Sequence, residues 1–166
     1  QKGFRWLHDN FGSNLRLTEI QSAIGRIQLQ KLEKWTKLRE KNALILLQEL
    51  RDLSVLRIPL PTSNFKHAWY KFYAYLRPDA LASDWTRDRV LNELSLKGFP
   101  ALTGSCGEIY MEKCFQNARL APKARLNNAS ELSNNSLTFL IHPTITDEQM
   151  INYSKAIRNV LIRAQK

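Results

Sequence analysis

Residues Gly12 to Leu32, GSNLRLTEIQSAIGRIQLQKL, set the architecture of this chain. The stretch opens with a polar turn, Gly12-Ser13-Asn14, and passes into a helix start at Thr18-x-x-Gln21, which has the spacing of a capping box. A turn of this kind places backbone N–H groups and a short amide side chain at a helix N-terminus, where an anion can be held. Asn14 could hold a phosphate in this way, but from the spacing alone an asparagine that only shapes the turn is the favoured interpretation.

The helix that starts at Thr18 is predicted to be long. Apolar residues recur at helical spacing from Ile20 to Leu50, and no proline lies between them. At 1.5 Å per residue, a single helix from Thr18 to Asp52 is roughly 50 Å long. This length exceeds one small domain, so we expect a bend near Leu32 or a helix that connects two domains.

Shorter elements follow the long helix. Four runs rich in apolar or aromatic residues predict strands, at 55–60, 67–76, 99–102 and 136–141. Helical patterns predict three more helices, at 87–97, 129–134 and 146–165. The segment 104–128 is predicted to be mostly loop, with one helical turn around Glu112.

Local signals mark the ends of two of these helices. Thr86 is placed to cap the first and Gly98 to end it, and Thr146-x-x-Gln149 is a second capping box. The order of elements predicts an α+β fold, in which a small antiparallel sheet packs with helices and a long helix precedes it. We expect two parts: 1–52, the turn with the long connecting helix, and 53–166, a small α+β domain.

The composition bounds the possible functions. The chain has 166 residues, enough for one domain with a core, and a net charge of +10 that suits an anionic partner. No apolar run approaches the roughly 20 residues of a membrane span. The chain starts at Gln1 with no secretory pattern, so we expect a piece of a longer protein whose other part balances the charge.

Histidines and cysteines offer no chemistry at a recognisable spacing. His8, His67 and His142 lie far apart, and Cys106 and Cys114 do not have the spacing of a zinc site. Two cysteines do not make a disulfide framework, so a reduced, cytoplasmic setting is expected, although this pair could close a small loop. A Cys106 nucleophile lacks a positioned base. The residues alone therefore predict no catalytic group and no metal site.

The same N-terminal stretch closely resembles the DegT/DnrJ/EryC1/StrS family of sugar aminotransferases, which use pyridoxal phosphate. The family pattern Gly-x-Asn-x-Arg-(Leu/Met)-(Thr/Ser)-(Glu/Asp)-(Ile/Leu)-Gln-Ala-Ala stands here as Gly12 to Ala23. Two further matches follow, at Gln28 to Leu32 and at Arg39 to Ala43. A looser likeness covers the aromatic strand around Trp69, the helix before Gly98, and the residues before the last helix.

The resemblance implies a fold, a site and partners. It implies the C-terminal domain of an aspartate-aminotransferase-like fold, with the upstream cofactor-binding domain absent from this chain. Asn14 matches a family asparagine that reaches across a homodimer interface to the cofactor phosphate of the other subunit, and Arg16 matches an arginine expected to hold the turn. The implied substrates are a nucleotide-linked keto sugar and an amino-acid amino donor, commonly glutamate. The implied setting is cytoplasmic surface-polysaccharide or deoxysugar biosynthesis.

Two departures from the family pattern bear on activity. Nothing here matches the lysine that forms the Schiff base with the cofactor, so this chain alone is expected to be inactive. Many members also carry a His-Tyr pair that faces the sugar, where this chain has Gly104 to Tyr110, GSCGEIY. Glu108 and Tyr110 are therefore candidate substrate-binding residues; the alternative is a solvent loop with a packed Tyr110.

Three other hypotheses stay open from the sequence. Relatives with a histidine in place of the lysine act as sugar dehydratases. A basic module for nucleic acid would use the helix segment Arg26 to Lys41 and the aromatic strand, but a solvated helix face and a packed sheet explain both more simply. A domain used only for association would use the long helix as its interface.

Overall fold

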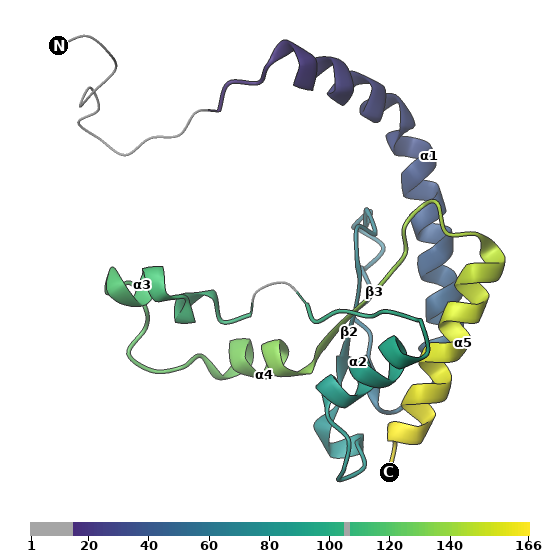
Figure 1. Ribbon diagram of the computed structural model, residues 1–166, viewed down its shortest axis with the longest axis vertical. Helices are drawn as coiled ribbons and strands as arrows, with labels where there is room; N and C mark the ends of the chain where they lie inside the picture. Colours follow the sequence, from purple (N-terminus) through teal and green to yellow (C-terminus); the bar gives the residue numbers. More distant parts are fainter. Residues whose placement is uncertain (1–14, 105–106) are drawn as a thin grey trace. The chain divides into compact units, whose positions relative to one another are not determined.

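The computed structural model describes residues 15–104 and 107–166, which contain a long helix, a three-stranded antiparallel sheet and several shorter helices (Figure 1). The chain divides into two compact units, Gln1–Lys34 and Trp35–Lys166, and the long helix passes from one into the other. Asn14 and Cys106 lie outside the described residues. The α+β class predicted from the sequence is confirmed.

The long helix, α1, spans Glu19–Leu50, close to its predicted bounds. The predicted capping box is present, because the N–H of Gln21 donates to Thr18 Oγ1 at 3.3 Å and the N–H of Thr18 donates to Gln21 Oε1 at 2.9 Å. These bonds satisfy backbone donors that the start of a helix leaves without an intrahelical acceptor.

The two halves of α1 differ in burial. In the unit Trp35–Lys166, Leu46 and Leu50 are fully buried in the core. In the unit Gln1–Lys34, the apolar residues Ile20, Ile24 and Ile27 are exposed by 75%, 54% and 52%. Among the described residues, the apolar side chains of the second half are therefore buried in their own unit, whereas those of the first half are exposed.

Three strands form the sheet in the order β1-β2-β3, each pair antiparallel: β1 (Leu56–Arg57), β2 (Phe72–Leu76) and β3 (Ser136–Phe139). Phe72 pairs with Phe139, and Tyr75 pairs with Ser136. Each strand lies inside one of the predicted runs and is shorter than that run.

The fourth predicted strand, 99–102, is wrong. Only an isolated bridge forms there among the described residues: the N–H of Leu102 donates to the Thr138 carbonyl at 3.0 Å, and the reverse bond measures 2.7 Å. Pro100 explains the difference, because it has no N–H to donate and so interrupts a ladder of hydrogen bonds.

Two helices, α2 (Arg87–Leu96) and α5 (Asp147–Ala164), begin and end as their sequence signals predict. Thr86 Oγ1 accepts from the N–H of Arg89 at 3.2 Å, and the predicted capping box is present at the start of α5. Gly98 follows α2 with φ of +76°, a left-handed conformation that glycine adopts without steric cost.

The remaining helices are short: η1 (Pro78–Ala80), η2 (Ile109–Met111), α3 (Lys113–Asn117) and α4 (Asn127–Asn135). The helical turn near Glu112 and the helix at 129–134 are thus confirmed, with α4 longer than predicted. α4 ends at Asn135, and its C-cap residue, Ser136, is already the first residue of β3.

The core lies on one face of the sheet. Phe72, Ala74 and Leu76 of β2 pack there with buried residues of α5 and of the second half of α1. In Figure 1, α5 and this part of α1 lie side by side on one side of β2 and β3, and α3 and α4 lie on the other. No helix within residues 15–104 and 107–166 has the length and apolar character needed to cross a membrane.

Polar contacts join α1 to the final helix and the segment before it. The side-chain amide of Asn42, a buried residue, donates to the His142 carbonyl at 3.0 Å. Arg158 Nη1 donates to the Glu49 carbonyl at 2.5 Å, and the same guanidinium donates to both carboxylate oxygens of Asp52, just after α1, at 2.6 and 2.7 Å. The second half of α1 is therefore fixed by hydrogen bonds as well as by its apolar side.

Candidate functional site

The outer face of the sheet, turned away from the core, forms the candidate site. Along β2, the side chains between the buried residues belong to Tyr73 and Tyr75, which are half-buried on this outer face. Three hollows open beside them, and Tyr75 lines all three. Concave surfaces that combine aromatic side chains with a few polar groups are where proteins usually bind small molecules.

The hollow between the two tyrosines and the loop after α2, here called the tyrosine hollow, has a volume of about 380 Å³. Its lining consists of Tyr73, Tyr75, Gly104, Gly107, Glu108, Ala129, Leu132, Ser133 and Ser136. Aromatic faces, hydroxyl groups and a carboxylate are the groups that pack against and hydrogen-bond to a ligand rich in hydroxyls.

Two glycines let the loop approach β3 and α4 closely at the tyrosine hollow. A Cβ on Gly104 would lie 2.8 Å from Ser136 Oγ, and a Cβ on Gly107 would lie 2.1 Å from Ser133 Oγ and 3.0 Å from Ser133 Cα. Because part of the second clash is with backbone, a side chain at residue 107 would push the loop away from α4. The shape of the hollow therefore depends on glycine at residue 107.

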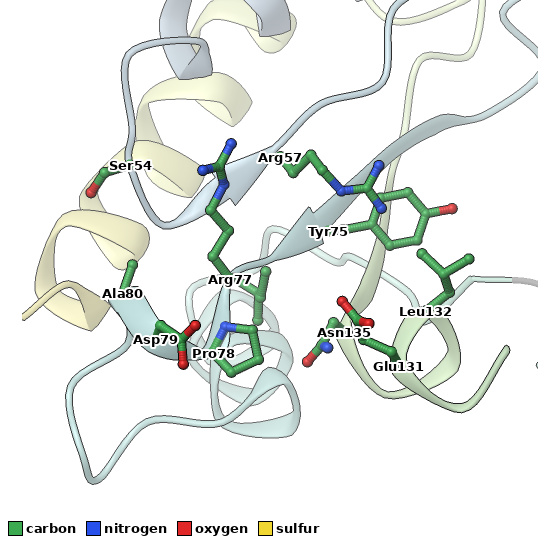
Figure 2. A pocket seen from close by; sticks show the side chains of 11 residues that line it. Ser54, Arg57, Tyr75, Arg77, Pro78, Asp79, Ala80, Glu131, Leu132 and Asn135 are labelled. Carbon is green, nitrogen blue, oxygen red and sulfur yellow. The ribbon is translucent and has the colours of Figure 1, made fainter. Parts of the chain in front are cut away.

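A second hollow of about 630 Å³, here called the arginine hollow, lies on the other side of Tyr75 (Figure 2). Arg57 Cζ lies 4.5 Å from the centroid of the Tyr75 ring, a distance typical of a cation–π contact. Figure 2 shows Arg57 and Tyr75 on the strands, with Glu131 approaching from α4. Arg77 and Asp79 also line the hollow, so its charges are balanced and do not select an anion.

The third hollow, of about 320 Å³, lies between the segment Pro59–Pro61 and the start of β2. Trp69 lines it but is only 9% exposed, and its ring stacks on Phe72 at 5.8 Å. The N–H of Trp69 donates to His67 Nδ1 at 2.9 Å, and its φ of +49° places it in a turn rather than in the predicted strand. Trp69 and Phe72 are thus packed inside, which removes two of the aromatics that a nucleic-acid module would use for stacking.

Glu108 lies in the wall of the tyrosine hollow. Its Oε1 accepts hydrogen bonds from the Tyr110 hydroxyl at 2.6 Å and from Arg125 Nε at 2.9 Å, and Arg125 Nη2 contacts its Oε2. The hydrogen bonds from Arg125 and then Tyr110 lower the pKa of Glu108 to about 2. The carboxylate is therefore ionised at neutral pH, so it can accept hydrogen bonds but cannot serve as a general acid.

The two candidate substrate-binding residues, Glu108 and Tyr110, are hydrogen-bonded to each other, but only Glu108 lines the tyrosine hollow. Glu108 lines the hollow, whereas Tyr110 stands behind it, with a hydroxyl that also accepts from the N–H of Leu126 at 3.0 Å. Sequence reasoning missed Arg125, because it lies 17 residues from Glu108 across a segment predicted as loop. The pair of glycines, Gly104 and Gly107, was the signal in the sequence that this loop approaches another element closely.

The other residues singled out in the sequence have simpler surroundings. Arg16 is exposed, and Cys114 is an exposed free thiol; Cys106, its possible partner in a small loop, lies outside the described residues. His142 Nδ1 lies 2.7 Å from Thr144 Oγ1. Among the residues that the structure describes, no group of three or more His, Cys, Asp or Glu side chains is placed to hold a metal ion.

Comparisons with known proteins agree with the resemblance seen in the sequence. The model of the DegT/DnrJ/EryC1/StrS aminotransferase family matches residues 1–158. Among solved structures, an aminotransferase from Psychrobacter cryohalolentis is 38% identical and superposes with a TM-score of 0.86, covering 99% of this chain and 44% of that chain.

Two curated proteins are similar at lower identity. The dTDP-4-dehydro-2,6-dideoxy-D-glucose 3-dehydratase of Saccharopolyspora spinosa is 26% identical, over 90% of this chain and 31% of that protein. The dTDP-3-amino-3,4,6-trideoxy-alpha-D-glucose transaminase of Streptomyces venezuelae is 23% identical, over 93% of this chain and 38% of that protein. The chain therefore spans between 31% and 44% of the length of these three relatives.

Proposed function

We propose a function from one premise: the chain belongs to the DegT/DnrJ/EryC1/StrS aminotransferase family. The whole protein is a pyridoxal-phosphate-dependent aminotransferase of deoxysugar or surface-polysaccharide biosynthesis. It replaces the keto oxygen of a nucleotide-linked sugar with the amino group of an amino acid, commonly glutamate, whose carbon becomes a keto group. The observation that carries the proposal is the family match along residues 1–158, and the similarity to the Psychrobacter aminotransferase supports it.

The role proposed for the N-terminal turn is to hold the cofactor phosphate. Pyridoxal phosphate, when bound, supplies the electron sink through which an amino group moves from donor to acceptor. Asn14 would donate its amide to that phosphate in the partner subunit of a homodimer. In support, the helix after it begins with the Thr18 capping box, and the start of a helix carries the positive end of its dipole. The Schiff-base lysine lies upstream in this proposal, so the chain alone is inactive.

The role proposed for the tyrosine hollow is to form one wall of the sugar site. Tyr73 offers a ring face, Ser133 and Ser136 offer hydroxyls, and Glu108 offers an ionised acceptor held by Tyr110. Each of these groups binds and orients a sugar; none of them needs to move a proton. This division agrees with the expectation that the catalytic lysine belongs to another part of the protein.

The exposed apolar residues of α1 support the proposed homodimer. Ile20, Ile24 and Ile27 are exposed by half or more in the unit Gln1–Lys34, at helical spacing. Burying such a stripe against another protein surface removes apolar area from water and stabilises the association. The whole protein is proposed to act in the cytoplasm, without nucleic acid as a partner.

Amino transfer can be tested directly with the whole protein. The purified protein, loaded with pyridoxal phosphate, is incubated with nitrogen-labelled glutamate and a dTDP-linked keto sugar, and the nucleotide sugar is analysed by mass spectrometry. Uptake of labelled nitrogen into the sugar, with release of 2-oxoglutarate, is the expected result. The 166-residue chain alone is the matched control and should transfer no nitrogen.

A second candidate is dehydration of the same kind of substrate. It is favoured by the similarity to a protein named as a 3-dehydratase, which is 26% identical. In the same assay a dehydratase would give a sugar product that has lost water and gained no labelled nitrogen. That outcome would replace the aminotransferase proposal with the dehydratase one.

A further inference from the structure

The loop wall of the tyrosine hollow is held by a residue that lies outside the hollow. We propose that Arg125 is a positioning residue: it fixes the Glu108 carboxylate, and with it the wall that a sugar meets in the tyrosine hollow. This inference rests on the proposed function, because it takes the hollow to be the sugar-binding part of that site.

The contact between Arg125 and Glu108 is specific in geometry. Arg125 Nε donates to Glu108 Oε1 at 2.9 Å, and Nη2 contacts Oε2, so the planar guanidinium engages both carboxylate oxygens. The Glu108 side chain is 9% exposed, whereas that of Arg125 is 58% exposed. The solvent-exposed guanidinium of Arg125 therefore neutralises the Glu108 carboxylate, which is largely buried.

A second bond closes the same loop. The Tyr110 hydroxyl donates to Glu108 and accepts from the N–H of Leu126, the residue next to Arg125. Residues 108–110 are thus joined to residues 125–126, directly before α4 begins at Asn127. The segment between them contains the last residue of η2 and the whole of α3, and neither short helix has a buried residue that would anchor it in the core.

The backbone at Glu108 explains why the closure is needed. Glu108 has φ of +30°, in the left-handed region that residues with a side chain rarely adopt. The residue before it, Gly107, is pressed against α4 so closely that a Cβ there would lie 2.1 Å from Ser133 Oγ. Without Arg125, this disfavoured conformation loses the contact that holds it, so the loop moves off α4 and the hollow widens.

Arg125 acts through Glu108 rather than on a ligand. It is absent from the residues that line the tyrosine hollow, and its guanidinium is occupied by Glu108. Its effect should therefore fall on the binding of the sugar and not on the amino donor, which has no hydroxyl pattern for this wall to recognise. Lysine at residue 125 would keep the charge but cannot reproduce the fork that engages both oxygens.

The test compares Arg125→Ala and Arg125→Lys with a matched control in the whole protein. Arg163→Ala is the control, because Arg163 is similarly exposed, at 51%, and pairs with Glu93 at 3.1 Å between α5 and α2. The first readout is calorimetric binding of dTDP-, UDP- and GDP-glucose, which lack a keto group and so bind without reacting. The second readout is hydrogen exchange at the amides of residues 107–110 and of Leu126.

The expected result is a change in both readouts. Arg125→Ala should raise the Kd of the tightest of the three nucleotide sugars about tenfold, because a displaced Glu108 no longer accepts one charge-assisted hydrogen bond from the sugar. It should also speed exchange at Leu126. Arg125→Lys should lie between it and the parent, and Arg163→Ala should stay within about twofold of the parent in Kd.

Three outcomes overturn the inference. If Arg125→Ala speeds hydrogen exchange but leaves the Kd unchanged, Arg125 only stabilises the loop. If exchange is unchanged, Arg125 does not hold the loop. If the unmutated whole protein binds none of the three nucleotide sugars, the hollow is not a sugar site. Failure of the proposed function is separate from these. A parent that binds nucleotide sugar but transfers no amino group refutes the aminotransferase, while Kd and exchange still decide the role of Arg125.

Discussion

The two halves of α1 share one apolar pattern, but the apolar side chains of the two halves differ in exposure among the described residues. In the second half, Leu46 and Leu50 are fully buried and Asn42 is hydrogen-bonded to the segment before α5. In the first half, Ile20 and Ile24 are mostly exposed. The comparison teaches that one apolar pattern can have two outcomes: in the second half it stabilises the fold, and in the first half it leaves apolar side chains exposed, as the proposed homodimer contact requires.

The largest expected effect separates the two halves by stability. Leu46→Ala should lower the free energy of unfolding of the 166-residue chain by about 2–5 kcal/mol, because it leaves a cavity in the core. The matched change in the first half, Ile24→Ala, should lower it by less than about 1 kcal/mol, since that side chain is 54% exposed. Urea unfolding of both variants checks this, and equal losses would show that the first half is also part of the core.

The next effect should appear in function rather than in stability. Asn14→Ala in the whole protein should weaken retention of pyridoxal phosphate about tenfold, because one hydrogen bond to a charged phosphate is lost. The melting temperature of the cofactor-free protein should not change. Absorbance of the cofactor after dialysis gives the measurement, and equal occupancy in variant and parent would contradict the role proposed for Asn14.

A smaller loss of stability is expected at the polar contact of the second half. Asn42→Ala removes the amide that donates to the His142 carbonyl at 3.0 Å, in a side chain that is 2% exposed. The loss of one such partly buried hydrogen bond costs about 0.5–1.5 kcal/mol, so the midpoint of urea unfolding should fall accordingly. Asn42→Asp is the control of similar size; it lacks the N–H donor and should not restore the parent value.

The smallest expected effect is a dependence of the free energy of unfolding on pH, caused by Asp52 just after the end of α1. Hydrogen bonding from Arg158 lowers the pKa of Asp52 from 3.8 to about 2. Because the folded pKa is the lower one, this contact stabilises the fold fully above pH 3.8 and is lost as the pH falls towards 2. Both side chains are partly exposed, so the effect should be modest and reduced by salt.

The pH effect is measured as a difference between two proteins. The parent and Asp52→Asn are unfolded with urea at several values between about pH 5 and pH 2, and the gap in stability between them should close towards the acid end. Subtracting the variant removes the contribution of Glu108, whose pKa is also lowered to about 2. A constant gap would show that Asp52 titrates normally in the folded state.

The parts of the fold that were predicted depend on neighbours in sequence. The caps at Thr18, Thr86 and Thr146 are hydrogen bonds over three residues, and Gly98 ends α2 through its own backbone freedom. Such signals are complete within one turn of helix, so no knowledge of the tertiary structure is needed to recognise them.

The parts that were missed depend on distant partners. Residues 99–102 do not form a strand, because Pro100 has no N–H to donate. Only Leu102 pairs with Thr138 there, as an isolated bridge among the described residues. Trp69 was expected in a strand but leaves it because its ring packs on Phe72 and its N–H on His67. In the candidate site, the segment that holds Glu108 was recognisable, but Arg125 became its partner only through the folding of the loop between them.

The direct junction of α4 and β3 has a mechanical consequence for the outer face of the sheet. Ser136 caps the helix and is also the first residue of the strand, where it pairs with Tyr75. No linker residue therefore separates α4 from β3, and a rotation of α4 would be transmitted to the strand. The same helix borders both the tyrosine and the arginine hollows. A ligand that tilts α4 from one hollow must reshape the other, and by reciprocity the second occupant would change the affinity for the first by the same factor.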